Sequence, residues 1–288
     1  MQEFIVVFMS GLSLGTQYAL VAVGFTLIFG ILGVINFAHG GFYAIGGYLA
    51  FYCVHSLGMP FVLAAVVAVL LTAALGYLIE VVIVHRFIED HIATLLITLG
   101  IYLMISSGLT TIFGPEPVPF SFPISGALRW ERIYLPYSSI VLISVCATSI
   151  TALYWLVFRT RYGIALRAMA DDAAVAQAQG IPASRMFPLA FALAAGLAAL
   201  TGVLVTPILS LEPHSGDAVL GTAFIVVILG GLGSISGAVV AALAVGLIEA
   251  FASVYLGGSR GALVLFLLVM VMLVLRPEGL LGTKARKA

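Results

Sequence analysis

The sequence carries very little charge: only 8% of its 288 residues are Asp, Glu, Lys or Arg, while 62% are hydrophobic. An ordinary soluble domain has about 25% charged residues, which cover its surface. Twelve basic and twelve acidic side chains are too few for that, and the mean hydropathy is +1.22. We therefore expect most of the protein to lie in lipid, which excludes a soluble enzyme, a nucleic-acid binder and a secreted disulfide scaffold.

Cysteine and lysine are equally scarce. The two cysteines, Cys53 and Cys146, lie inside apolar runs, where a thiol behaves as a small hydrophobic group instead of forming a disulfide or metal site. The two lysines, Lys284 and Lys287, lie in the C-terminal tail and follow no Gly-x-x-x-x-Gly loop. A Walker A phosphate site is therefore excluded. We expect no cofactor and no metal in this chain, and no ATP hydrolysis by this route.

Acidic residues inside the apolar runs are few. Glu80 lies near the end of its run beside His85 and Arg86, so snorkelling or local pairing accounts for it. Glu249 lies deeper and is the better candidate for a buried polar role. No relay of carboxylates of the kind that proton-driven transporters use is visible in the sequence.

The apolar runs predict an all-α fold, a polytopic transmembrane bundle of eight to ten spans in one domain over residues 1–288. A helix needs roughly 20 apolar residues to cross the bilayer. Two of the runs are short and rich in glycine, which suggests broken or re-entrant helices. The first run follows a single charge, Glu3, so we expect it to be retained and not cleaved as a signal peptide. Candidate spans cover residues 5–33, 39–57, 61–84, 93–113, 137–158, 187–209, 218–233, 237–256 and 261–275.

The basic residues are distributed unevenly among the connections. With nine spans, nine of the twelve basic residues fall on one side, in the connections around Arg86 and 159–186 and in the tail 276–288. The other three are Arg129, Arg132 and Arg260. Because basic loops stay in the cytoplasm, we expect the C-terminus inside and the N-terminus outside. The proline-rich connection 114–136 is then an ordered outer loop, either a structural cap or a docking surface.

Two short motifs resemble enzyme signatures without their context. Gly11-Leu12-Ser13-Leu14-Gly15 fits the Gly-x-Ser-x-Gly nucleophile elbow, but it lies in an apolar helix, where small residues four apart favour helix packing. The glycines of 230–237 nearly match a dinucleotide fingerprint, but no βαβ unit surrounds them. We therefore predict no catalytic residue.

Glycine-rich interruptions occur in both halves of the chain, at 30–47 and at 230–237. In transporters such a pair of interrupted segments indicates a substrate pathway, although tight helix packing also requires glycine. Polar side chains at membrane depth cost free energy unless they are paired, and a structural histidine here is at least as well supported as a substrate ligand. The predicted pathway residues are Asn36, His39, Gly40, Gly231, Gly233 and Glu249.

The connection 159–186 predicts a short surface helix. Residues 164–179 are rich in helix-forming residues, and Gly180 followed by Pro182 is a helix stop. A helix that rests on lipid needs a large apolar face and many basic residues. This one has alanines and Asp171-Asp172 instead, which favours docking to another protein.

Four stretches of the sequence resemble the permeases of ATP-binding-cassette importers of the branched-chain amino acid type, a group that includes sugar and urea permeases. Together the stretches cover nearly the whole chain in the order found in that family. They are Gly15-Thr16-Gln17-Tyr18-Ala19-Leu20 with Gly24 and Asn36-Phe37-Ala38-His39-Gly40; Arg161-Tyr162-Gly163, Arg167-Ala168, Asp171-Asp172 and Gly180-Ile181; Leu229-Gly230-Gly231-Leu232-Gly233-Ser234 with Gly237 and Glu249-Ala250; and Arg276-Pro277-Glu278-Gly279-Leu280-Leu281-Gly282.

The resemblance implies two cytoplasmic ATPase subunits that hold the ATP, a second permease subunit, a periplasmic solute-binding protein and a location in the bacterial inner membrane. It also implies that the 159–186 connection is the coupling element for the ATPase. One departure is that the widespread Glu-Ala-Ala form is replaced by Asp171-Asp172-Ala173-Ala174. The ATPase-coupling residues on this pattern are Gly163, Arg167, Ala170, Asp171, Asp172, Gly180 and Ile181.

The sequence therefore predicts a transport subunit without chemistry of its own. It would move branched-chain or related amino acids between outward-open and inward-open states, while high affinity resides in the binding protein. One alternative is a self-sufficient ion-coupled transporter or channel that uses Glu249 and His39. Another is an intramembrane hydrolase that uses Ser13 and His39.

Overall fold

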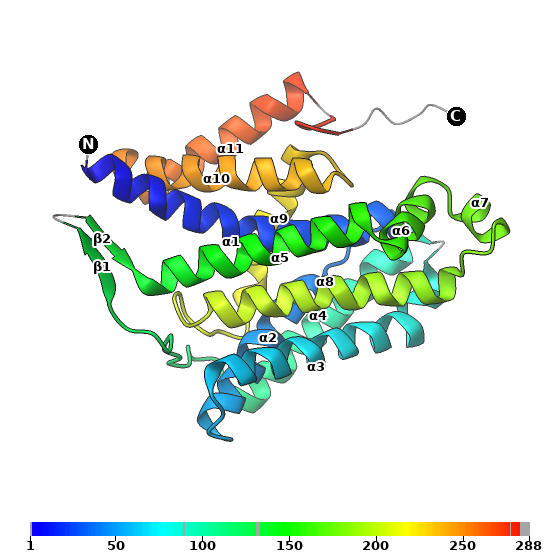
Figure 1. The fold of residues 1–288 in the computed structure, drawn as a ribbon, viewed down its shortest axis with the longest axis horizontal. Coiled ribbons are helices and arrows are strands. Elements are labelled where there is room, and N and C mark those ends of the chain that lie inside the picture. Colours follow the sequence, from blue (N-terminus) through cyan, green and yellow to red (C-terminus); the bar gives the residue numbers. More distant parts are fainter. Residues whose placement is uncertain (1, 89, 131–132, 277, 283–288) are drawn as a thin grey trace. The chain divides into compact units, whose positions relative to one another are not determined.

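The computed structural model describes residues 2–88, 90–130, 133–276 and 278–282, and each predicted span corresponds there to one helix. Six of these helices (α1, α3, α4, α5, α8 and α10) are long and apolar enough to cross a membrane. The prediction of a multi-pass helical membrane protein is confirmed. The elements are α1 Gln2–Leu32, α2 Ala38–His55, α3 Phe61–Val82, the 3₁₀ helix η1 Val84–Phe87, α4 His91–Phe113, β1 Ala127–Trp130, β2 Ile133–Pro136, α5 Tyr137–Arg159, α6 Arg161–Asp171, α7 Ala173–Ala178, α8 Ala183–Val205, α9 Ser215–Gly230, α10 Ile235–Leu256 and α11 Gly258–Leu275 (Figure 1).

The chain folds into two compact units. Unit 1 comprises residues 1–26, 122–150 and 221–288, and unit 2 comprises residues 27–121 and 151–220. Helices α1, α5 and α9 each contribute residues to both units. That the whole chain is one transmembrane domain stays a prediction.

The centre of unit 2 is the glycine-rich helix α2, which packs against α3, α4 and α8. Gly46 lies directly against the backbone of Ala199, and Gly202 against the carbonyl of Tyr43. A side chain at either glycine would collide with main chain, so these residues permit the close approach of α2 and α8. The short, glycine-rich span at 39–57 is thus an interior helix.

Unit 1 contains a similar close contact between α1 and α10. Gly11 and Gly15 lie against the backbone of Leu247 and Leu243, and Gly246 lies against Gly15 in return. The Gly-x-Ser-x-Gly motif is therefore a helix-packing surface, as its membrane context predicts. Ser13, at its centre, is 7% exposed.

The connection 114–136 contains the two strands that the described residues form, within a fold that is otherwise helical, as predicted. Its second part forms an antiparallel hairpin in which Leu128 pairs with Leu135 and Arg129 with Tyr134. Glu131 and Arg132, which we assigned to the outer loop, lie outside the described residues. Runs with aromatic and branched residues, such as Ile133-Tyr134-Leu135, favour extended backbone, which accounts for the second strand.

The two ends of unit 2 differ in the connections that they carry. At one end, the residues around η1 and the junction of α7 and α8 line a shared groove of about 440 Å³ that includes Arg86, Asp90 and Gln177. At the opposite end, Val118 pairs with Leu211 between the connections that follow α4 and α8. The connections around Arg86 and 159–186, which were predicted to lie on the same side of the membrane, thus lie at the same end of unit 2. Of the basic tail, Lys284, Arg286 and Lys287 lie outside the described residues.

Candidate translocation site

Helix α9 begins near the middle of the membrane span formed by α4. Tyr102 is the twelfth of the 23 residues of α4, about 16 Å from the start of that helix. Its hydroxyl donates a hydrogen bond to the carboxylate of Asp217, in the first turn of α9. The start of α9 therefore lies level with the middle of α4, whereas our predicted span 218–233 begins one residue after Asp217.

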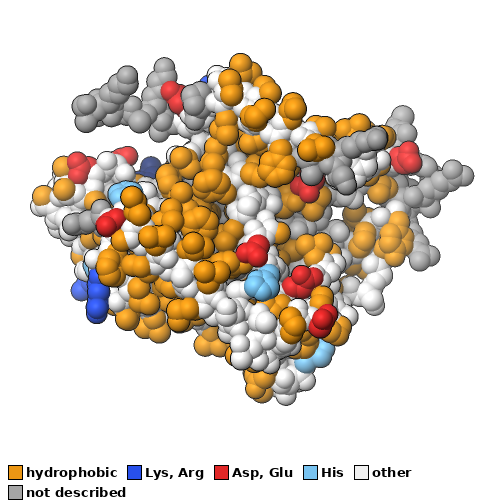
Figure 2. Space-filling model, turned by 180° about the vertical axis from the view of Figure 1, so that it is seen from behind, with side chains coloured by type: hydrophobic (Ala, Val, Ile, Leu, Met, Phe, Trp, Pro, Cys, Tyr) orange, Lys and Arg blue, Asp and Glu red, His pale blue; other side chains and the backbone are white. Residues whose placement is uncertain are grey.

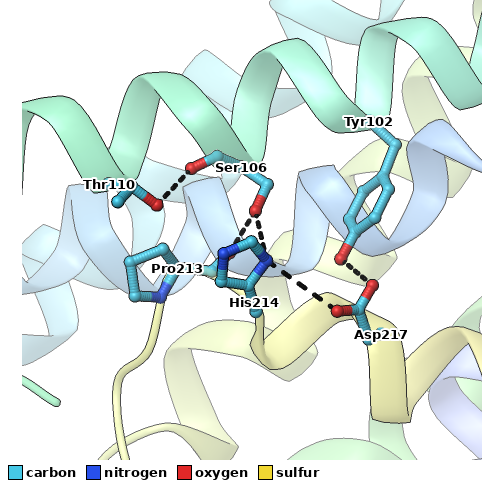
Figure 3. Close-up of polar contacts among 6 residues, drawn as sticks. All are labelled: Tyr102, Ser106, Thr110, Pro213, His214 and Asp217. Atoms are coloured by element: carbon cyan, nitrogen blue, oxygen red, sulfur yellow. Dashed lines mark hydrogen bonds and ion pairs between the residues drawn. The ribbon is translucent and has the colours of Figure 1, made fainter. Parts of the chain in front are cut away.

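Four side chains from α4 and the start of α9 form one polar cluster (Figure 3). The hydroxyl of Ser106 donates to the carbonyl of Pro213 at 3.2 Å and lies 2.9 Å from Nδ1 of His214. The same Nδ1 lies 3.8 Å from Oδ2 of Asp217. We call Tyr102, Ser106, His214 and Asp217 the α4–α9 cluster.

Glycines allow the start of α9 to reach this position. A Cβ atom on Gly40 of α2 would lie 2.8 Å from the carbonyl oxygen of Gly216 and closer still to the side chain of Leu220. The negative side chain of Asp217 also suits the first turn of a helix, where the unpaired N–H groups favour anions. Gly40, predicted as a pathway residue, thus supports the α4–α9 cluster through packing.

The α4–α9 cluster contains Ser, His and Asp, but its geometry is not that of a hydrolase. In a catalytic triad the serine and the aspartate contact opposite nitrogens of the imidazole. Here Ser106 and Asp217 both approach Nδ1 of His214. The serine therefore cannot pass its proton through the ring, and the arrangement suits binding rather than nucleophilic attack.

The two halves of the α4–α9 cluster differ in exposure. Tyr102 and Ser106 are buried, whereas the side chains of His214 and Asp217 are 64% and 62% exposed. An exposed carboxylate at membrane depth is costly against lipid and normally faces water or protein. Figure 2 shows acidic side chains and a histidine amid a largely hydrophobic surface.

The predicted pathway residues Asn36 and His39 are buried inside unit 2, with exposures of 3% and 0%. The Asn36 side chain accepts a hydrogen bond from the backbone of Ala38 at 3.0 Å, which stabilises the start of α2. The hydroxyl oxygen of Thr98 on α4 accepts a hydrogen bond of 3.2 Å from the backbone N–H of Phe37. These contacts give Asn36 a structural role, and its role on a pathway, like that of His39, stays a prediction.

Glu249 has the polar partner that its depth requires. In unit 1 its carboxylate accepts a hydrogen bond of 2.8 Å from the hydroxyl of Tyr18 on α1. Both side chains are half-buried. Glu249 stays a candidate pathway residue, now with a defined partner.

The glycines at 230–233 form a backbone contact with the segment after α11. Gly231 and Gly279 both have positive φ angles, of 101° and 81°, and their main chains touch. The N–H groups of Leu280 and Leu281 donate to the last carbonyls of α9 at 2.7 and 3.0 Å. Packing of the two segments thus accounts for Gly231. A pathway role for Gly231 and for Gly233, which also has positive φ, stays a prediction.

The connection 159–186 contains two helices, so our prediction of a single helix over 164–179 was wrong. Asp172 is extended, with φ −158° and ψ 102°, and its carboxylate accepts the N–H of Val175 at 2.9 Å. An aspartate that caps the start of one helix cannot also continue the helix before it, because the cap requires extended backbone. The helix stop at Gly180, with φ +89°, is confirmed.

Helix α6 is fixed by one face and exposed on the other. Leu166 and Met169 are buried, and a Cβ on Gly163 would collide with the last turns of α5. Burial of Tyr162 next to this contact raises the pKa of its phenol. The other predicted coupling residues are at least partly exposed, and Arg167 lies 5.2 Å from the ring of Phe158. They are Arg167, Ala170, Asp171, Asp172, Gly180 and Ile181.

Glu80 is completely buried, and its carboxylate lies 3.0 Å from Nδ1 of His85. The local pairing that the sequence suggested is confirmed, and snorkelling is excluded because the side chain is 0% exposed.

Sequence reasoning missed the α4–α9 cluster. One signal was available: Glu212-Pro213-His214-Ser215-Gly216-Asp217 is a polar run between two apolar helices. Our predicted spans, 187–209 and 218–233, left this run between them without a role. Its depth follows only from the contact with Tyr102 on α4.

Comparison with known proteins relates the chain to one family. Residues 7–275 match the family described as the permease component of branched-chain amino acid transport systems. The chain is 32% identical to the high-affinity branched-chain amino acid transport system permease protein BraD of Pseudomonas aeruginosa, over 95% of this chain and 94% of BraD. It is 31% identical to LivH of Escherichia coli K12 over the same shares of the two chains.

A second Escherichia coli K12 permease protein of the high-affinity branched-chain amino acid system, LivM, is 25% identical, over 92% of this chain and 67% of LivM. No solved structure was found to match. The family match extends over most of the chain, so this protein belongs to the permease components of branched-chain amino acid transport systems.

Proposed function

We propose that this chain is a permease subunit of an ATP-binding-cassette importer that moves branched-chain amino acids, or a closely related small polar solute, across the bacterial inner membrane. The observation that carries the proposal is its relationship, over 95% of its length, to BraD and LivH, which are permeases of that solute class. The multi-pass helical architecture supports it.

The proposed complex contains two ATPase subunits in the cytoplasm, a second permease and a periplasmic binding protein. Escherichia coli K12 has two related permeases, LivH and LivM, which supports pairing of two different chains. We assign the ATPase contact to the exposed residues of α6 and α7, and the binding-protein contact to the connection 114–136. The C-terminus is then cytoplasmic, and ATP is held by the partner subunits.

The packing of α6 suggests how the partner's energy reaches the membrane helices. Gly163 brings α6 against the last turns of α5, and Leu166 and Met169 are buried beneath it. Only residues 179–182 separate α7 from α8. If an ATPase subunit displaces α6 and α7, α5 and α8 should therefore move with them, because no long loop separates these helices.

Reconstitution of the whole complex in liposomes tests the proposal. We expect uptake of radiolabelled leucine to require this chain, the second permease, the ATPases, ATP and the binding protein together. Asp171→Arg is expected to reduce coupled ATPase activity and uptake at least several-fold, because it reverses a charge on the proposed ATPase contact. Glu116→Gln, which alters an exposed carboxylate of the other loop, is the matched variant and should keep the ATPase subunits bound.

A self-sufficient ion-coupled transporter is the second candidate, because the exposed pair His214 and Asp217 at membrane depth could hold an ion. Leucine uptake by liposomes that contain this chain alone, driven by a proton or sodium gradient, would favour it and overturn the importer proposal. Absence of gradient-driven uptake together with ATP-dependent uptake by the complex supports the importer.

A further inference from the structure

A groove of about 520 Å³ lies between α3 and α8 of unit 2, two helices that run side by side (Figure 1). The described residues that line it are apolar except Tyr162, the second residue of α6. The hydroxyl of Tyr162 is itself buried and does not open onto the groove. We call this hollow the α3–α8 groove. It offers hydrocarbon surface, so a polar group inside it would lose its hydrogen bonds, and the part of a ligand that it holds must be apolar.

Small side chains create the α3–α8 groove. A Cβ atom on Gly196 of α8 would lie 3.5 Å from the Cβ of Ala73 and 3.6 Å from Cγ1 of Val69, both on α3. These are ordinary contact distances, so the packing of α3 on α8 does not require glycine at this position. The missing side chain leaves space instead. Leu70 and Leu189, which also line the groove, are exposed, so the groove opens on the outer surface of the helices.

The length of the groove matches one leaflet of a bilayer. Its lining on α8 runs from Leu189 to Leu200, which is about 16 Å at 1.5 Å per residue. The hydrocarbon core of a bilayer is about 30 Å thick, so the groove covers roughly half of it. A membrane helix of a partner protein crosses both leaflets and would need a matching surface about twice as long. A single lipid acyl chain stays within one leaflet.

A basic residue lies at one end of the groove. Arg185 precedes Leu189 by one turn on the same face of α8, it is exposed, and neither ion pair found among the described residues includes it. An acyl chain is as stable in bulk lipid as in an apolar groove, so the groove alone selects no particular lipid. A cation at headgroup level favours a lipid with a negative charge.

We propose that the α3–α8 groove binds an acyl chain of an anionic phospholipid whose phosphate lies at Arg185. The inference goes beyond the proposed function, because it concerns a lipid and not the transported solute. In the orientation proposed above, the lipid belongs to the cytoplasmic leaflet. Because Tyr162 belongs to α6, the bound chain also joins the proposed ATPase contact to α3 and α8.

Native mass spectrometry of the full chain, freed of lipid in detergent, tests the headgroup contact. The probes are phosphatidylglycerol and phosphatidylcholine with the same acyl chains. We expect the first phosphatidylglycerol to bind several-fold more tightly than phosphatidylcholine, and Arg185→Gln to remove this preference. Arg86→Gln is the matched control. Arg86 is also exposed, but it shares its groove with Ala183 and Phe187, on the other face of α8, so the preference should persist.

A second pair of variants tests the acyl chain. Ala192→Phe fills the groove and should reduce binding of the first phosphatidylglycerol several-fold. Ala74→Phe adds the same side chain at an exposed position of α3 outside the lining and should leave binding unchanged. Arg185→Gln changes only an exposed side chain, so it decides the question even if Ala192→Phe fails to fold.

Either of two results would overturn the inference: an unchanged preference for phosphatidylglycerol in Arg185→Gln, or unchanged binding of phosphatidylglycerol by folded Ala192→Phe. If Ala192→Phe keeps the lipid but releases the second permease from the complex, the groove belongs to that subunit and the lipid site is refuted. Failure of the complex to import leucine would refute the proposed function and leave the lipid measurement unaffected.

Discussion

At the residue scale, a buried ionisable side chain of unit 2 is stabilised by a hydrogen bond from a residue close to it in the chain. Glu80 is 0% exposed, and one of its carboxylate oxygens, Oε2, has no hydrogen-bond partner among the described residues. Its other oxygen depends on His85. Loss of the remaining partner would leave this buried carboxylate without a hydrogen bond and would lower the free energy of unfolding.

His85→Ala is therefore expected to lower the free energy of unfolding by roughly 1–3 kcal/mol. The measurement is the melting temperature of the purified protein in detergent. His91→Ala, which removes an exposed histidine at the start of α4, should change the melting temperature little. The double variant Glu80→Gln/His85→Ala should recover part of the loss, because an unpaired amide costs less to bury than a carboxylate. A double variant no more stable than His85→Ala contradicts this account.

At the element scale, the break between α6 and α7 defines the shape of the proposed ATPase contact. Helix α7 has only six residues, and isolated helices of that length are unstable in water. Its N-terminus is capped by the carboxylate of Asp172, and its end is closed by the hydrogen bond from Ile181 to Ala176 at 3.1 Å. The cap at Asp172 therefore contributes a large part of the order in α7.

Substitutions at Asp172 separate the cap from the charge. Asp172→Ala removes a cap worth about 1 kcal/mol, and we expect a several-fold loss of solute-stimulated ATPase activity in the reconstituted complex. Asp172→Asn removes the charge but keeps the cap, so its activity should stay close to that of the wild type. Equal losses in the two variants would show that the charge matters and not the helix start.

At the scale of the whole molecule, a tyrosine–carboxylate pair on the membrane helices is found among the described residues of each compact unit. Tyr18 and Glu249 form the pair in unit 1, and Tyr102 and Asp217 form the pair in unit 2. Both acids belong to glycine-flanked helices of otherwise apolar composition. In both pairs a tyrosine hydroxyl from another helix supplies the hydrogen bond that the carboxylate needs.

The orientation of unit 2 in the membrane can be tested with single cysteines. Ser56, after α2, and Ser184, at the start of α8, are exposed at opposite ends of unit 2. The native Cys53 and Cys146 are buried, so their background labelling is low. In spheroplasts, a membrane-impermeant maleimide should label Ser56→Cys and not Ser184→Cys. Inside-out vesicles should give the reverse, and the opposite pattern in either preparation would contradict a cytoplasmic 159–186 connection.

The sequence by itself determined the solvent, the fold class and the family. Long apolar runs must become helices in lipid, because every backbone polar group there needs an internal partner. The pairing of Glu80 with His85 and the helix stop at Gly180 were also predictable, because they depend on residues only a few positions apart. Local composition and local geometry are sufficient for features of this kind.

Only the tertiary structure decided where the polar groups lie. His214 and Asp217 belong by sequence to a connection, and only their contacts with Ser106 and Tyr102, more than 100 residues away, place them at membrane depth. Asn36 and His39 are candidate pathway residues by sequence, yet they are buried. Depth and exposure result from packing between distant segments, such as the contact of Gly40 with the start of α9, and hydropathy along the chain does not contain that information.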